Sequence, residues 1–181
     1  MEKSIYLIRH CEAEGQPSES QLTEIGFTQA NELSDYFNDL KVDMIISSPF
    51  LRAIQMIKPF AEKRNVKIGI DSRLSERVLS STSFPNWLDK LNVTFKDMEL
   101  KYVGGESSKD AMNRIVQVVD EIIASDLKNT IIVTHGNIMS LLLNNYDKNF
   151  GFQEWKSLSN PDVYLLRITK NDVYHKRLWK G

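Results

Sequence analysis

Ser4-Ile5-Tyr6-Leu7-Ile8-Arg9-His10 is a short apolar run that ends in two polar residues. An apolar stretch of this length is typical of a strand that is buried on both faces of a sheet. Thr130-Ile131-Ile132-Val133 repeats the pattern and runs into Thr134-His135-Gly136. Ligands of open α/β sheets bind beyond the carboxyl ends of the strands. The two stretches therefore predict that their histidines lie in one crevice.

Further strand and helix patterns alternate along the first half of the chain. A buried strand is expected from Val42 to Ile46, and a further strand from Lys67 to Ile70. A helix is expected to begin after the N-cap Thr23 and to end near Lys41, because apolar residues recur there at helical spacing.

A second helix is expected to follow the loop Ser47-Ser48-Pro49, and Pro59 is expected to kink or split it. Ser107 and Asp110 form a candidate capping box in front of the clearest amphipathic helix of the chain.

The C-terminal part of the chain predicts a hairpin at one edge of the sheet. Val163 to Ile168 and Val173 to Leu178 read as strands that flank Thr169-Lys170-Asn171-Asp172. Strands that alternate with helices predict an α/β fold, here a three-layer sandwich in which helices flank a mostly parallel central sheet.

Composition limits the class of protein. With 181 residues, of which 41% are hydrophobic, the chain is expected to form one domain over residues 1–181. Its net charge of −1 predicts no basic face for nucleic acid. Cys11, the only cysteine, has no disulfide partner in the chain, and the stretch from Ile5 to Ile8 is too short for a signal peptide or a membrane span. We therefore expect a cytoplasmic protein that binds neither nucleic acid nor membrane, and the oligomeric state stays open.

Several segments, taken in order, resemble motifs of the histidine phosphatase, or phosphoglycerate mutase-like, superfamily. Each motif is weak alone, and their order makes the set specific. The segments are Arg9-His10-Cys11-Glu12, Leu22-Thr23-Glu24-Ile25-Gly26 with Gln29-Ala30, Ser47-Ser48-Pro49-Phe50-Leu51-Arg52-Ala53, Leu74-Ser75-Glu76, Gly104-Gly105-Glu106-Ser107 and Val133-Thr134-His135-Gly136. They span most of the chain, and the resemblance implies a phosphoglycerate mutase-like fold.

The resemblance also implies a metal-independent phosphatase that needs no cofactor and acts on a small phosphorylated metabolite. Neutral His10 would attack phosphorus and become a phosphohistidine, with its other ring nitrogen bound to a backbone carbonyl. Arg9, Arg52 and His135 would hold the phosphoryl oxygens, because guanidinium groups fit phosphate in a bidentate manner. Glu76 would give a proton to the leaving alkoxide and then activate the water that releases phosphate.

The chain departs from the family pattern close to the nucleophile. Cys11 replaces the usual glycine, Ala13 the usual threonine, and Gln16 the usual asparagine. Gln16 is still expected to contact phosphate, while Arg77 and Gly136 are candidate substrate contacts. The departures leave the substrate and the rate more open than the mechanism.

Other interpretations remain at this stage. A phosphoglycerate mutase would use the same His10 chemistry, although the chain is short for one, and a non-catalytic module that binds a phospho-ligand or a protein is a different class. Residues 78–103 form either a lid or a small helix that packs on the domain, and the lack of arginine among them argues against a second phosphate on the substrate. Each candidate residue taken alone also fits a purely structural role. The enzymatic interpretation requires two guanidinium groups and two imidazoles around one anion, with neither imidazole sealed from solvent.

Overall fold

The computed structural model describes residues 2–170 and 172–180. Six strands form one sheet in the order β3-β2-β4-β1-β5-β6. They are β1 (Lys3–Arg9), β2 (Met44–Ser47), β3 (Ile68–Ile70), β4 (Asn129–Thr134), β5 (Asp162–Ile168) and β6 (Val173–Lys180). The first four strands pair in parallel, and β5 and β6 add antiparallel pairs. This confirms the mostly parallel sheet.

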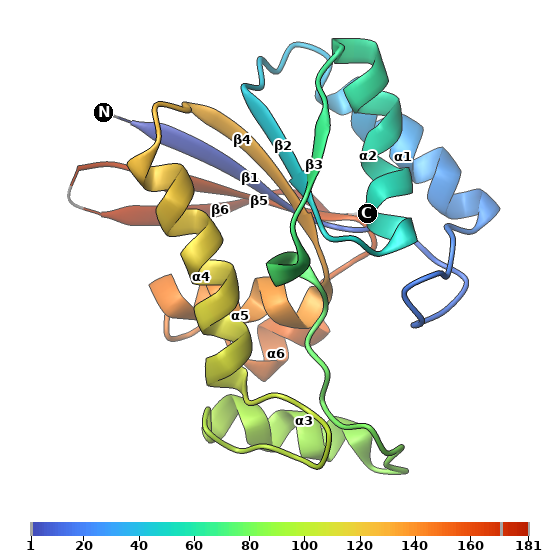
Figure 1. Cartoon of the computed structure of the whole chain (residues 1–181), viewed down its shortest axis with the longest axis vertical. Helices are drawn as coiled ribbons and strands as arrows, with labels where there is room; N and C mark the ends of the chain where they lie inside the picture. The colour runs from blue at the N-terminus through green and yellow to red at the C-terminus, as the bar shows by residue number, and fades with distance from the viewer. Residues whose placement is uncertain (1, 171, 181) are drawn as a thin grey trace.

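Helices cover both faces of the sheet, as Figure 1 shows. On one face lie α1 (Glu24–Tyr36) and α2 (Leu51–Arg64), and on the other lie α4 (Ser108–Ala124) and α5 (Gly136–Tyr146). The shorter elements are η1 (Ser72–Leu74), α3 (Trp87–Lys96) and α6 (Phe152–Lys156). The three-layer sandwich is thus confirmed.

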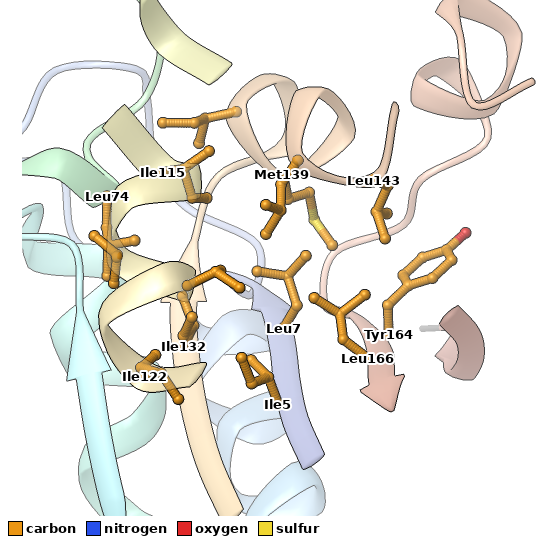
Figure 2. Close-up of a cluster of buried hydrophobic side chains, with 14 of the residues drawn as sticks. Ile5, Leu7, Leu74, Ile115, Ile122, Ile132, Met139, Leu143, Tyr164 and Leu166 are labelled. Atoms are coloured by element: carbon orange, nitrogen blue, oxygen red, sulfur yellow. The ribbon is translucent and has the colours of Figure 1, made fainter. Parts of the chain in front are cut away.

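Strand β1 lies inside the sheet and contributes to both hydrophobic cores. Ile5 and Leu7 pack with α4 and α5, as Figure 2 shows, and Ile8 packs with α1 and α2. All three side chains are fully buried. The run that opens the sequence therefore has the two-sided burial that its composition predicts.

The C-terminal hairpin is present, and β6 is the edge strand. Thr169 and Asp172 close the described part of its turn through a hydrogen bond from the Thr169 N–H to the Asp172 carbonyl. Asn171, which the sequence also places in this turn, lies outside the described residues.

One expectation about helices is wrong, and of the two outcomes expected at Pro59, a kink or a split, the split does not occur. The first helix ends at Tyr36 instead of near Lys41. Phe37, which continues the apolar spacing, is its C-cap, and its ring packs against Phe60 of α2. Pro59 does not split α2, which is one helix from Leu51 to Arg64. One face of α2 is buried on the sheet. This packing keeps the helix continuous, although Pro59 cannot donate a backbone hydrogen bond.

The predicted caps are present. The Thr23 hydroxyl accepts a hydrogen bond from the Gly26 N–H at the start of α1, and Ser107 and Asp110 form a capping box on α4. Gly26 also permits a close approach, because a Cβ atom there would lie 2.0 Å from the Glu12 carbonyl oxygen. The start of α1 thus packs directly on the segment that follows His10.

None of the helices in the described ranges is both long enough and apolar enough to cross a lipid bilayer.

Lys3 anchors the N-terminal strand to α4, and its loss should destabilise the fold. Its ammonium group is buried and donates to the carbonyls of Ile122, Ser125 and Leu127 at the C-terminal end of α4. A cation is favourable at a helix C-terminus, and carbonyls left without a donor are not. We expect Lys3→Met to lower the free energy of unfolding by about 1 to 3 kcal/mol in urea titrations.

Lys148→Met is the matched control, since Lys148 is exposed. Equal stability of the two variants would contradict the anchoring role of Lys3.

Candidate active site

The parallel strands end level with one another. Arg9 pairs with Thr134 in the β1–β4 register, and Ser47 pairs with Val133 in the β2–β4 register. The residues that follow these strands therefore emerge at the same edge of the sheet. His10 and His135 lie with ring centroids 5.1 Å apart, so the two histidines meet at this edge.

Hydrogen bonds fix the tautomer of His10. Its Nδ1 lies 2.7 Å from the Cys11 carbonyl oxygen, an acceptor, so Nδ1 carries the proton. Its Nε2 accepts a hydrogen bond from Nε of Arg52 at 3.2 Å. The Nε2 lone pair is therefore held toward a guanidinium group. The contact of Nδ1 with the Cys11 carbonyl is the one that the sequence predicts.

Burial keeps His10 uncharged. Desolvation, together with the charges of Arg52 and Arg9, lowers the pKa of the imidazole to about 3. The hydrogen bond to the Cys11 carbonyl acts in the opposite direction and raises this pKa. A neutral imidazole at physiological pH is the form that can act as a nucleophile.

Arg52 and Arg9 bring two guanidinium groups to the same edge. Arg52 is 1% exposed and donates from Nη1 to the Pro17 carbonyl at 2.7 Å. Arg9 donates from Nη1 to the carbonyls of Leu158 and Ser159, both at 3.2 Å, while its Nε has no partner among the described residues. Burial lowers the pKa of both arginines, and the Glu76 carboxylate opposes the shift.

Gly136 makes room for Arg9. A Cβ atom at position 136 would lie 3.0 Å from Nε of Arg9 and 3.2 Å from its Cζ. Any larger residue would push the guanidinium group out of its present place. The glycine after His135 thus allows α5 to begin directly against Arg9.

Two cavities adjoin at this edge. The smaller has a volume of about 140 Å³ and the larger of about 530 Å³. Six candidate residues from the sequence line the smaller one: Arg9, His10, Gln16, Arg52, Glu76 and Gly136. The larger one shares four of them and adds Arg77.

The Glu76 carboxylate sits on the N-terminus of α5. Its Oε1 accepts hydrogen bonds from the N–H groups of Arg77 and Ile138, and its Oε2 accepts one from Asn137. Backbone amides at a helix start orient an anionic group firmly. Oε2, with a single amide donor, is the less occupied of the two oxygens.

Arg77 and Gln16 differ in how they are held. The Arg77 guanidinium is buried and donates to the Glu106 carbonyl and the Thr94 hydroxyl. Arg77 therefore lines the larger cavity with its polar head already bonded. Gln16 is exposed at the rim shared by both cavities.

His135 is more enclosed than expected. The expectation that neither imidazole is sealed from solvent is wrong for His135, which is 0% exposed and lines neither cavity, but it holds for the nucleophile candidate His10, which lines the smaller cavity. The Phe50 ring packs edge-on against it at 4.6 Å, and His10 contacts another side. Burial lowers the pKa of His135 well below its ordinary value, helped by the positive charges of Arg52 and Arg9.

Ser48 orients this buried imidazole. Its Oγ lies 2.7 Å from Nε2 of His135 and accepts a hydrogen bond from the Phe50 N–H. The hydroxyl proton is then directed to Nε2, which leaves the imidazole proton on Nδ1. Nδ1 has no partner among the described residues.

Sequence reasoning missed several residues of the site. Ser48 lies in a quoted motif, and its position two residues after a strand was an available signal. Asn160 lines the smaller cavity and donates from its side chain to the His10 carbonyl at 2.8 Å. Nothing near Asn160 in the sequence indicates this contact, which joins residues 150 apart.

Metal ligands do not cluster in the described ranges: no group of three or more histidine, cysteine, aspartate or glutamate residues there could hold a metal ion.

A family model and a relative match this sequence. The family model described as the histidine phosphatase superfamily (branch 1) matches residues 5–179. "Putative phosphoserine phosphatase 2" of Hydrogenobacter thermophilus is 26% identical over 157 residues, which cover 78% of this chain and 77% of that protein.

Solved structures share the fold at lower identity. A mycobacterial glucosyl-3-phosphoglycerate phosphatase matches with a TM-score of 0.81 and 19% identity, with 100% of both chains covered. An α-ribazole phosphatase from Shigella flexneri matches with a TM-score of 0.77 and 19% identity over 97% of this chain and 95% of the other. The family match, which spans nearly the whole chain, shows that the protein belongs to the histidine phosphatase superfamily.

Proposed function

We propose that this protein hydrolyses small phosphate monoesters through a phosphohistidine on His10. The observation that carries the proposal is the geometry of the nucleophile: a neutral imidazole whose Nε2 lone pair faces the buried Arg52 guanidinium, with the charge of Arg9 also acting on the ring. Membership of the superfamily supports phosphomonoester hydrolysis.

In the first step, Nε2 of His10 attacks phosphorus in line with the ester oxygen. Before this attack, as the phosphate binds, Arg52 moves its Nε–H from the imidazole to a phosphoryl oxygen, which exposes the lone pair and neutralises part of the charge of the anion. Arg9 neutralises further charge, and Gln16 at the rim adds a polar contact. The bond between phosphorus and the ester oxygen breaks as the bond to Nε2 forms.

Glu76 handles the proton. Protonated on Oε2, its less occupied oxygen, it gives the proton to the leaving alkoxide and becomes a carboxylate. In the second step the carboxylate accepts a proton from water as the water oxygen attacks phosphorus. The bond to Nε2 breaks, inorganic phosphate leaves, and His10 returns to its neutral form. Gly136 keeps Arg9 in place beside this reaction.

His135, whose ring contacts that of His10, is proposed to bind a phosphoryl oxygen. With Ser48 bound at Nε2, its Nδ1–H is the group without a partner, and it would donate to a phosphoryl oxygen once Arg52 has moved. The enclosed position excludes water from this bond and strengthens it.

Residues 78–103 are proposed to cover the site of a single domain that spans residues 1–181. Leu79, Trp87 and Leu91 from this segment line the larger cavity, and Leu91 is buried. Arg77 and Gly136 would contact the alcohol part of the ester from the opposite side. The buried free Cys11 fits a reducing compartment, so we place the enzyme in the cytoplasm. Its nearly balanced charge favours neither nucleic acid nor membrane as a partner.

Replacing the nucleophile should abolish turnover. We expect His10→Ala to lower kcat for phenyl phosphate by roughly a thousandfold or more, because no other side chain replaces the covalent step. The wild type should keep its rate in excess chelator. His175→Ala, in which the lost imidazole lies on β6, is the matched control.

The same assay separates the alternatives. Undiminished turnover by His10→Ala would defeat the nucleophile assignment. Isomerisation of phosphoglycerate faster than phosphate release would establish the mutase, and no activity on either ester would favour the binding module.

Loss of the Ser48 hydroxyl should release the tautomer of His135. We expect Ser48→Ala to lower kcat for phenyl phosphate roughly tenfold or more with little change in KM, because the affected bond strengthens in the transition state. Ser47→Ala is the control: its hydroxyl is equally buried but is bound only to the Ser48 carbonyl. Equal kcat values for the two variants would remove Ser48 from the mechanism.

Both site histidines should stay neutral across physiological pH. Burial lowers their pKa values from 6.5, so the unfolded chain takes up protons that the folded chain does not. This difference lowers stability as the pH falls from 6.5 toward 3, and it vanishes above 6.5. In NMR titrations of the folded protein, the imidazole signals of His10 and His135 should not shift between about pH 5 and 8.

The signals can be assigned from His10→Gln and His135→Gln, and the protein in urea provides the reference titration. A midpoint near 6.5 for either residue in the folded state would show that burial does not control its charge.

A further inference from the structure

The larger cavity has an apolar wall next to the phosphate site. Leu79, Trp87, Leu91 and Trp155 form this wall, and Arg9 and Glu76 form the side shared with the smaller cavity. A phosphoryl group held at His10 would therefore extend its alcohol part into a space of about 530 Å³ between these residues. Cavities of this size accommodate small organic ligands.

Two indole rings dominate the wall. Trp87 from α3 and Trp155 from α6 meet edge to face, with centroids 6.2 Å apart and planes at 88°. Trp155 is supported from behind by Phe152, which stacks on it at 5.4 Å with planes 26° apart. Trp87 is 48% exposed, so part of its ring remains free for contact. A fixed aromatic surface of this kind favours a flat ring as its ligand.

Asn137 adds hydrogen-bonding capacity beside this wall. It lines the larger cavity, and neither Oδ1 nor Nδ2 of its side chain has a partner among the described residues. Its backbone N–H is bound to Glu76, so the residue is fixed at the start of α5. A primary amide offers one donor and one acceptor side by side. Buried polar groups of this kind are normally satisfied, so the amide is available to a ligand.

The charged groups of this cavity are already occupied. The Arg77 guanidinium is bound to Glu106 and Thr94, and the Glu76 carboxylate to three backbone amides. Arg9 faces the phosphate site. No uncommitted cation among the described lining residues remains for a second anionic group on the substrate.

We infer that the alcohol part of the substrate carries an uncharged, flat heteroaromatic ring, with a hydrogen-bond donor and acceptor on its edge. The ring would pack on Trp87 and Trp155, and its edge would meet the Asn137 amide. This inference rests on the proposed phosphatase function, since it concerns the leaving group of the same site.

The test compares primary alkyl phosphates of similar intrinsic reactivity. The probes are uridine 5′-monophosphate, which has such a ring, ribose 5-phosphate, which has none, and phosphoserine, which carries further charges. We expect kcat/KM for uridine 5′-monophosphate to exceed that for ribose 5-phosphate by roughly tenfold or more. Phosphoserine should be turned over no faster than ribose 5-phosphate.

Variants connect this preference to the wall and the amide. Trp87→Leu, Trp155→Leu and Asn137→Ala should each reduce the ratio of the two kcat/KM values several-fold. Trp87→Phe should retain most of the ratio because it retains a ring. Asn113→Ala, at an exposed asparagine of α4, is the matched control and should leave the ratio unchanged.

The outcomes distinguish a failure of the ring inference from a failure of the proposed phosphatase function. If His10-dependent hydrolysis of phenyl phosphate is found but the ratio is near one, the ring inference is overturned and the phosphatase stands. If phenyl phosphate is not hydrolysed, the proposed function fails, and tryptophan fluorescence still tests the ring site. Uridine 5′-monophosphate should quench this fluorescence in His10→Ala at lower concentration than ribose 5-phosphate, and equal concentrations would refute the site.

Discussion

The parallel pairing of β1 with β4 is the constraint on which the rest of the structure depends. It sets Arg9 opposite Thr134, so the next residue of each strand is a histidine at the same edge of the sheet. β2 pairs on the other side of β4 and brings Ser48 and, in the first turn of α2, Arg52 to that edge. A slip of one residue in either register would turn these side chains to the opposite face.

Burial and charge act together in the site. Two guanidinium groups lie beside two imidazoles, and both the desolvation and the positive charges oppose protonation of the rings. The site is thus cationic without placing a proton on its nucleophile. Glu76 partly balances the cations while its own oxygens are held by the amides of α5. An arriving phosphate dianion meets donors that are already arranged, so little reorganisation is needed.

Much of this arrangement could be predicted because its signals are local. A short apolar run followed by a polar residue marks the end of a buried strand, and the motifs placed His10, Arg52 and His135 in order. The first helix was predicted too long because Phe37 continues the helical spacing of apolar residues. In the structure Phe37 is the C-cap of α1, and its ring packs on Phe60. Contacts between distant segments carry no such signal. The covering of His135 by Phe50, and the bond from Asn160 to the His10 carbonyl, depend on how loops meet after the sheet has formed.

The place of β1 in the sheet has a consequence for how the chain acquires its shape. β1 precedes both of its partners, β4 and β5, in the chain, and its Lys3 donates to a carbonyl 119 residues further along. During translation this apolar segment has no partner strand until β4 and β5 have left the ribosome. Long-range pairing of this kind slows folding and leaves hydrophobic surface uncovered in the meantime. The nucleophile and its arginines are therefore assembled late, and a nascent chain cut short before β4 would have no site at all.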